Sequence, residues 1–184
     1  MNEMMESAKH LAWIEQVNPK GLTEASLEDM ENLYRRDAVE AYSKVVDDEK
    51  IRQNLKLYFD TKAQKLSDII KDPNQKFWLA TQKGKVVGMA GYSISRRLIH
   101  SVYVSKEVRG HGVGSILMKR LISETADIAD GQPRSILVAE VNTRAIDFYK
   151  RLGFELSGAH KEWKIGDIAI PELELEIGGG HGSD

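Results

Sequence analysis

The chain of 184 residues is nearly balanced in charge and contains no cysteine. It has 26 Lys and Arg against 28 Asp and Glu, a formal net charge of -2, so no bulk electrostatic attraction to nucleic acid or to an anionic membrane is expected. The lack of cysteine excludes disulfides, thiolate metal sites and a cysteine nucleophile. With 41% hydrophobic residues, the chain has the length and composition for one well-buried core.

Both ends of the chain are predicted to lie outside the main domain, which spans residues 20–177. In residues 1–19, apolar side chains recur at helical spacing ahead of Pro19, which predicts an N-terminal helix over 2–17. There is no charged-then-apolar leader and no apolar run near the ~20 residues that cross a bilayer, so we expect a cytoplasmic protein. Residues 178–184 are rich in glycine and predict a flexible tail.

Helical periodicity gives way to strand-like periodicity in the middle of the chain. One helical pattern starts at Ser26, a good N-cap residue, and a second follows Asp48 and stops at Asp72-Pro73. The apolar residues then alternate with a period of two. This pattern predicts three antiparallel strands at 77–80, 86–94 and 98–104, with Gly84 as a turn residue between the first two.

A glycine-rich stretch, Arg-Gly-His-Gly-Val-Gly at 109–114, separates the third strand from an amphipathic helix. Glycine lets the backbone approach a ligand closely, and the N-terminus of a helix carries partial positive charge. The stretch is therefore interpreted as a cradle for a pyrophosphate. Two other phosphate motifs do not fit. A P-loop would need a lysine where Ser115-Ile116 follow Gly114, and a dinucleotide fold would place its glycines after the first strand.

The last third of the chain alternates helices and strands. The predicted elements are a helix ending at Asp130-Gly131, a strand at 135–139, a helix at 142–153, and strands at 154–163 and 168–177 around Gly166-Asp167. Pro171 lacks a backbone donor, so the last strand is predicted to lie at an edge or to carry a bulge. The order of elements, without internal repeats, predicts one domain of the α/β (α+β) class.

Three patterns occur together in this chain: the glycine-rich loop after a strand, Asn142 at the start of a later helix, and Phe148-Tyr149 shortly before Gly153. In this order and spacing they resemble the GNAT superfamily of acetyl-CoA-dependent N-acetyltransferases, over about residues 74–165. The resemblance implies a mixed, mostly antiparallel central sheet of about six to seven strands flanked by helices. The N-terminal helix would be an addition to that fold.

The resemblance also implies acetyl-CoA as co-substrate and no metal. Its pyrophosphate would lie on the backbone of the glycine-rich loop, and its pantetheine arm would pair with one strand and receive a hydrogen bond from the next helix. The residues implied are Arg109, Gly110, His111, Gly112, Val113, Gly114 and Ser115 for the pyrophosphate, and Val102, Tyr103, Val104 and Asn142 for the arm. The predicted strands are consistent with this pantetheine site. An extended ligand that carries amides can bind as an added strand where the strands from Leu98 and Ser135 diverge.

Amine acetylation needs a base, a donor for the oxyanion and an acid for the leaving thiolate. The resemblance implies Tyr149 as the acid and a backbone N–H near Val104 as the oxyanion donor. At two positions where many relatives carry a glutamate, this chain has His100 and Leu137, and leucine cannot accept a proton. Candidates for the base are therefore His100, whose ordinary pKa is near ~6.5, Glu140, and a base that acts through water.

Residues beyond the catalytic motifs are candidates for the acceptor pocket by location only. Tyr92, His160 and Glu162 are placed there, and Arg96-Arg97 is interpreted as a solvated turn or as a contact to phosphate or an acidic substrate. Without a cysteine or a serine nucleophile motif, direct attack in a ternary complex is expected.

The leading hypothesis is an N-acetyltransferase that acts on a primary amine. The acceptor would be a small cationic amine such as a polyamine, or a protein or peptide amine. The alternative is a non-catalytic module that binds acetyl-CoA and serves regulation or interaction. Neither nucleic acid nor a membrane is an expected partner, and a homodimer is left open.

Overall fold

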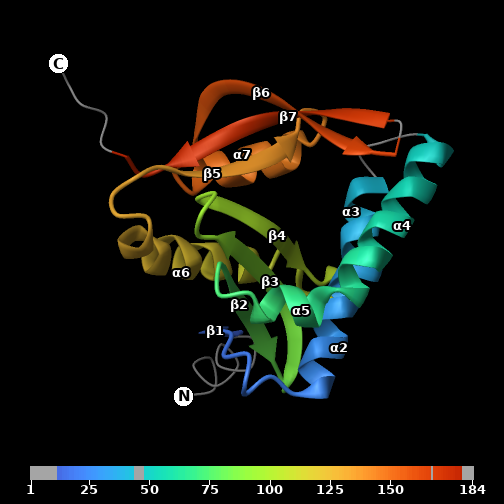
Figure 1. The fold of residues 1–184 in the computed structure, drawn as a ribbon, viewed down its shortest axis with the longest axis vertical. Coiled ribbons are helices and arrows are strands. Elements are labelled where there is room, and N and C mark those ends of the chain that lie inside the picture. The colour runs from blue at the N-terminus through green and yellow to red at the C-terminus, as the bar shows by residue number, and fades with distance from the viewer. Residues whose placement is uncertain (1–11, 44–47, 167, 180–184) are drawn as a thin grey trace.

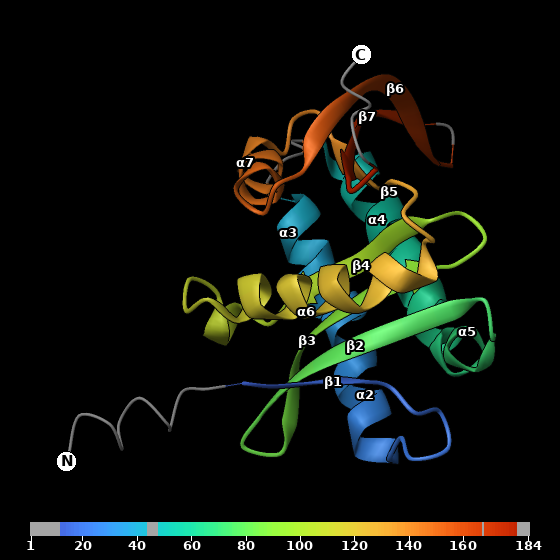
Figure 2. The same cartoon turned by 90° about the vertical axis from the view of Figure 1, so that its left-hand side faces the viewer.

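The computed structural model describes residues 12–43, 48–166 and 168–179, and these form a seven-stranded sheet with helices on both faces (Figures 1 and 2). The strand order is β1-β2-β3-β4-β5-β7-β6. The strands are β1 Trp13–Gln16, β2 Gln75–Gln82, β3 Lys85–Ser93, β4 Leu98–Val104, β5 Arg134–Ala139, β6 Glu155–Ile165 and β7 Ile168–Ile177. All neighbouring pairs are antiparallel except β4 with β5. The predicted mixed, mostly antiparallel sheet is confirmed.

The helices lie in two layers. They are α2 Glu24–Asn32, the π-helical turn η1 Leu33–Ala38, α3 Val39–Ser43, α4 Glu49–Gln64, α5 Leu66–Lys71, the 3₁₀ turn η2 Lys106–Val108, α6 Val113–Ile128 and α7 Thr143–Arg151. Helices α6 and α7 cover one face of the sheet, and α2 to α5 cover the other (Figures 1 and 2). Strand β2 contributes to both apolar cores, because Phe77 and Leu79 face α2–α5 while Trp78 faces α6.

Side chains at two helix starts explain where the first layer begins. The Thr23 hydroxyl accepts a hydrogen bond from the Ser26 N–H at 3.1 Å, so Thr23 caps α2 and Ser26 lies in its first turn. The Asp48 carboxylate caps α4 in the same way, through the Ile51 N–H at 3.1 Å. The second helical pattern therefore starts and ends where predicted, but Lys65 divides it into α4 and α5. The first helix starts three residues earlier than predicted.

Strands β4 and β5 diverge soon after they meet. Their pairing consists of Leu98 with Ser135 and Ile99 with Ile136, after which β4 continues from His100 to Val104 without a partner on that side. On its other side, β4 remains paired with β3 through a β-bulge around Ser101, whose φ is 55°. The predicted divergence is confirmed, and it leaves a free strand edge in the middle of the sheet.

Two sequence predictions are wrong at the ends of the sheet. Trp13–Gln16 form an edge strand on β2 instead of part of the predicted helix over 2–17, and residues 2–11 of that prediction lie outside the described residues. Strand β7 lies between β5 and β6, so Pro171 is in an inner strand. The Pro171 carbonyl points toward β5, where it accepts from the Glu140 N–H at 2.9 Å. The missing N–H of Pro171 therefore faces the end of β5 and breaks no bond with β6.

Among the described residues, no helix combines the length and the apolar character needed to cross a bilayer.

Candidate active site

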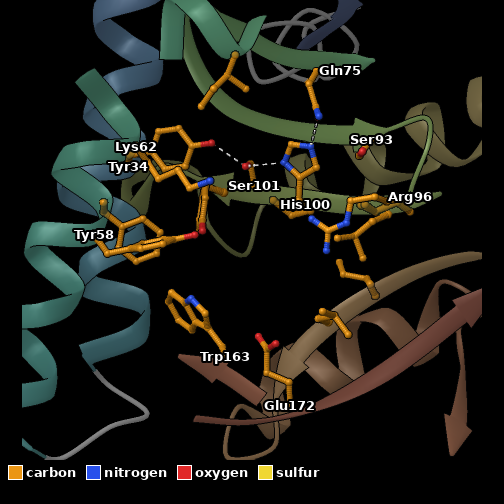
Figure 3. A pocket seen from close by; sticks show the side chains of 18 of the residues that line it. Tyr34, Tyr58, Lys62, Gln75, Ser93, Arg96, His100, Ser101, Trp163 and Glu172 are labelled. Carbon is orange, nitrogen blue, oxygen red and sulfur yellow. Dashed lines mark hydrogen bonds between the residues drawn. The ribbon is translucent and has the colours of Figure 1, made fainter. Parts of the chain in front are cut away.

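A cavity of about 810 Å³ opens where β4 and β5 diverge. Its walls come from both strands, from η1, α3, α4 and α5 on one side, from β6 and β7 below, and from α7 behind the divergence (Figure 3). The described residues thus bring His100, Val102, Tyr103 and Tyr149, four of the predicted site residues, into one space.

Aromatic side chains form one wall of the cavity. Successive rings touch one another, for example Tyr42 on Trp163 at 5.1 Å, Tyr58 on Trp163 at 5.1 Å, and Phe59 on Tyr103 at 5.8 Å between centroids. We call this set the aromatic wall; its members are Tyr34, Tyr42, Tyr58, Phe59, Tyr103 and Trp163. Ring contacts of this kind favour particular orientations, so the side chains form one packed surface.

A chain of hydrogen bonds crosses the roof of the cavity (Figure 3). Tyr34 Oη lies 2.6 Å from Ser101 Oγ, Ser101 Oγ lies 2.8 Å from His100 Nδ1, and His100 Nε2 lies 2.8 Å from Gln75 Oε1. The bulge in β4 is what turns the Ser101 hydroxyl into this chain. Because the Gln75 oxygen can only accept, His100 carries its proton on Nε2 and its Nδ1 accepts from Ser101.

The environment of His100 keeps the imidazole neutral. Burial, together with the positive charges of Lys62 and Arg96, lowers the pKa of His100 to about 4. Its ring stands edge-on to Phe77 and covers Gly91, where a Cβ would come within 2.4 Å of His100 Cε1. Both ring nitrogens are engaged, so His100 is placed as a positioning group for Ser101.

Acid should destabilise the protein through His100. The unfolded chain binds this proton below about pH 6.5 and the folded chain only below about pH 4, so the free energy of unfolding falls as the pH drops through that interval. His100 alone can lower the free energy of unfolding by at most about 3 kcal/mol over this interval. We expect His100→Gln to flatten the pH dependence of Tm between pH 6.5 and 4. The exposed His111 offers a control, because His111→Gln should leave that slope unchanged; equal slopes in all three proteins would contradict the assignment.

Glu172 on β7 places a carboxylate at the floor of the cavity (Figure 3). Its side chain belongs to a residue that is only 7% exposed, and burial raises its pKa. Its negative charge reaches two members of the aromatic wall, since it contributes to the raised pKa of both Tyr42 and Tyr58. Glu162, which the sequence did place at the acceptor pocket, also lines the cavity but is exposed.

Positive charge lies on the opposite side of the cavity. Lys62 of α4 and the exposed Arg96 between β3 and β4 both line it. Burial and the charge of Arg96 lower the pKa of Lys62, and its Nζ lies 5.5 Å from the centre of the Tyr58 ring. Of the two arginines at this turn, Arg96 lines the cavity and Arg97 does not.

The glycine-rich loop is tied to the helical layer by the buried carboxylate of Asp37. Asp37 Oδ1 accepts from the Lys106 N–H at 2.8 Å and from Arg109 Nη2 at 3.3 Å, and Oδ2 accepts from Arg36 Nη2 at 3.1 Å. Arg109 Nε also donates to the Val104 carbonyl at 2.8 Å. The Arg109 side chain therefore points inward and positions the loop, and its guanidinium is not directed at a ligand.

The loop itself presents backbone to open space. Gly110 and Gly112 have φ of 82° and 81°, and a Cβ built on either would meet nothing within 4 Å. Glycine is needed at both positions for the backbone conformation and not for lack of room. Gly112 is the N-cap of α6, so the free N–H groups of Val113, Gly114 and Ser115 follow directly.

The remaining predicted residues divide between those that reach the site and those that do not. Tyr149 is 7% exposed, lines the cavity, and is held between Phe148 and Phe154 at 5.2 and 5.7 Å. Asn142 caps α7 through the Ala145 N–H at 3.2 Å. Glu140 does not line the cavity. Its carboxylate lies 2.9 Å from Nδ1 of the exposed His160, so the structure does not bring either residue to the site.

Tyr92 is also absent from the cavity wall. It is fully buried behind the sheet, and its hydroxyl finds no hydrogen-bond partner among the described residues. The sequence analysis did not identify Asp37, Tyr34, Tyr42 or Glu172. Within the described part of the chain, no group of three or more His, Asp or Glu side chains is placed to hold a metal ion.

Comparison with known proteins now gives the family. Residues 27–154 match the acetyltransferase (GNAT) family. The chain belongs to that family. This GNAT acetyltransferase is 32% identical over 138 residues to the L-methionine sulfoximine/L-methionine sulfone acetyltransferase of Pseudomonas aeruginosa, covering 67% of this chain and 74% of that protein.

Two further similarities extend the comparison. The acetyltransferase is 28% identical over 115 residues to the peptidyl-lysine N-acetyltransferase YjaB of Salmonella typhimurium, covering 61% of this chain and 72% of the other. The structure of the PaiA N-acetyltransferase from Thermoplasma acidophilum, in complex with coenzyme A, superposes with a TM-score of 0.64 at 17% identity, over 90% of this chain and 99% of that one. The predicted GNAT fold is therefore confirmed.

Proposed function

We propose that this acetyltransferase moves the acetyl group of acetyl-CoA to the primary amine of a small molecule by direct attack in a ternary complex. The observation that carries the proposal is the cavity at the divergence of β4 and β5, which contains Tyr149 and opens beside the aromatic wall. Supporting it, the relative from Pseudomonas aeruginosa is named for small amino-acid acceptors. YjaB, named for peptidyl-lysine, supports a protein amine as the second candidate acceptor.

The donor half of the site has parts suited to acetyl-CoA. The N–H groups at the start of α6 and the open backbone of Gly110 and Gly112 would bind the pyrophosphate. The free edge of β4, including Val102 and Tyr103, would pair with the pantetheine arm as an added strand. Asn142 uses its side-chain oxygen for the helix cap, which leaves its amide group as a donor toward the same arm.

For the chemical half, the proposed acid is Tyr149, which lines the cavity. Burial raises the pKa of Tyr149, so its hydroxyl keeps its proton at neutral pH and can give it to the leaving thiolate. A backbone N–H of β4 near Val104 would stabilise the oxyanion. In the same cavity, a primary amine that stands against the aromatic wall would be shielded from water.

Acetyl-CoA should stabilise the folded protein, and the glycine-rich loop should be the reason. At about 100 times Kd, ligand binding adds ~2.7 kcal/mol, which corresponds to a rise in Tm of roughly 5–10 °C. Gly112→Ala forces a side chain into a left-handed backbone conformation at the cradle and should reduce that rise. Gly84→Ala imposes the same strain in a distant turn, where φ is 76°, and should keep the full rise.

Turnover is then measured as thiol release over a panel of primary amines and lysine peptides. We expect release with at least one small amine. Stabilisation by acetyl-CoA without release for any acceptor would favour a non-catalytic acetyl-CoA module instead. No stabilisation at all would contradict both functions.

A further inference from the structure

Glu172 is a largely buried residue whose carboxylate faces the cavity without a hydrogen-bond or ion-pair partner among the described residues. Only 7% of the residue is exposed, but its carboxylate oxygens are not enclosed by protein atoms, and the residue lines the cavity. Other glutamates of β7 differ in this respect, since Glu174 accepts from Ser157 at 3.2 Å and Glu176 from Ser135 at 3.3 Å. A partly desolvated carboxylate without a partner favours a cation that enters the cavity as a ligand.

The side chains around Glu172 are those that bind an alkylammonium group. The rings of Tyr42 and Tyr58 each stand edge-on to Trp163, and the negative charge of Glu172 acts on both tyrosines. Aromatic faces attract cations, and a carboxylate beside them supplies the counter-charge. In Figure 3 the Glu172 carboxylate points from β7 into the open centre of the cavity, beside Trp163.

We propose that Glu172 binds the ammonium group of the acceptor and is the base that deprotonates it, with Tyr42, Tyr58 and Trp163 enclosing the alkyl chain next to that nitrogen. The acceptor class is therefore a slender primary alkylammonium. This assignment rests on the acetyltransferase function proposed above. It adds a residue that the sequence motifs did not indicate, in a site where the other base candidates are unsuited.

Those other candidates fail for different reasons. Leu137 carries no ionisable group, and Glu140 lies outside the cavity beside His160. His100 has both ring nitrogens engaged, and its pKa is lowered to about 4, which makes it a weak base. Burial shifts Glu172 in the opposite direction and so makes its carboxylate a stronger base than an exposed glutamate.

The proton balance of the step is as follows. One proton moves from R–NH3⁺ to the Glu172 carboxylate, and the neutral nitrogen attacks the thioester carbonyl carbon. The C–N bond forms, the C–S bond breaks, and its electron pair leaves on the sulfur, which takes a proton from Tyr149. The second N–H proton, acidic once the C–N bond exists, restores the proton of Tyr149 through solvent, and Glu172 returns its proton to water. The products are the amide, CoA thiol and one released proton.

The test compares Glu172→Gln with Glu174→Gln in the full-length protein. Glu174 lies two residues further along the same strand, accepts a hydrogen bond from Ser157 and does not line the cavity, so the two variants make the same chemical change inside and outside the site. With the best alkylamine of the panel, we expect Glu172→Gln to lower kcat/KM by about 100-fold or more, the usual range for loss of a general base. Glu174→Gln should change it by no more than about twofold, and Glu172→Asp should recover part of the loss.

Two readouts separate this role from a structural one. Glu172→Gln removes a buried charge without changing shape, so its Tm should equal or exceed that of the wild type, and its stabilisation by acetyl-CoA should be unchanged. Calorimetric titration of n-butylammonium into the CoA-bound protein tests binding without turnover. We expect n-butylammonium to bind to the wild type and to Glu174→Gln, and to bind at least tenfold more weakly to Glu172→Gln.

Each negative result would contradict either the acetyl-transfer function or the role of Glu172, but not both. If the wild type releases no thiol with any amine yet binds n-butylammonium through Glu172, the acetyl-transfer function fails and the ammonium site stands. If the wild type turns over while Glu172→Gln keeps more than about a third of its kcat/KM, or if Glu174→Gln loses as much as Glu172→Gln, the role of Glu172 is overturned. Absence of n-butylammonium binding to the wild type also overturns the ammonium site.

Discussion

Asp37→Ala is expected to lower the free energy of unfolding by about 3–5 kcal/mol and to weaken acetyl-CoA binding. The carboxylate is fully buried and joins Arg36, Arg109 and the Lys106 N–H, so its removal leaves Arg109 without its ion-pair partner and the glycine-rich loop untied. The free energy is measured by urea denaturation, and acetyl-CoA binding by calorimetry. Both quantities should fall together, because one side chain serves the fold and the loop.

Asp60 provides a control for this effect. Its side chain is 46% exposed and pairs with Arg35 at the surface of α4, so Asp60→Ala should cost less than about 1 kcal/mol. If Asp37→Ala does not fold, Asp37→Asn keeps the shape and one acceptor oxygen and should show an intermediate loss. Equal stability of the Asp37 and Asp60 variants would refute the anchoring role.

Tyr149→Phe is expected to lower kcat by roughly 100-fold or more while acetyl-CoA binding stays close to that of the wild type. The variant keeps the ring that packs on Phe148 and Phe154 and removes only the hydroxyl of this cavity-lining residue. Steady-state kinetics with saturating acetyl-CoA gives kcat, and the thermal shift with acetyl-CoA gives the binding.

Tyr92→Phe is the matched control, because it deletes a hydroxyl that is buried without a hydrogen-bond partner in the described structure and lies away from the cavity. That change should leave kcat unaltered and should be neutral or stabilising by about 1 kcal/mol. An unchanged kcat in Tyr149→Phe would remove Tyr149 from the mechanism.

The sequence was most informative where local chemistry decides the structure. Gly84 as a turn residue and the glycines of residues 109–114 each favour a particular backbone conformation, so the elements beside them were placed correctly. Trp13–Gln16 were misjudged because a four-residue edge strand depends on its pairing with β2, which no local pattern records. Pro171 was misjudged because its tolerance depends on where a different strand, β5, ends.

The candidate site shows the same division. Glycine and asparagine motifs indicated the donor half, whereas the acceptor half depends on distant contacts. Glu172, Glu174 and Glu176 alternate along β7 and share one face, so the sequence alone does not distinguish the one that enters the cavity from its two hydrogen-bonded neighbours. Asp37 follows two arginines, a context typical of a surface residue. In the π-helical turn η1, however, its side chain is fully buried.

The brief pairing of β4 with β5 has a mechanical consequence. Two residue pairs are all that join strands β1–β4 to strands β5–β7 within the described sheet, so the sheet consists of two half-sheets connected by a narrow seam. A pantetheine arm in the gap would extend that seam with its own amides. We therefore expect the two half-sheets to move more independently when the site is empty, and amide hydrogen exchange along β4 and β5 to slow when acetyl-CoA binds. While it is bound, the co-substrate would therefore act as an eighth strand of the sheet, between β4 and β5.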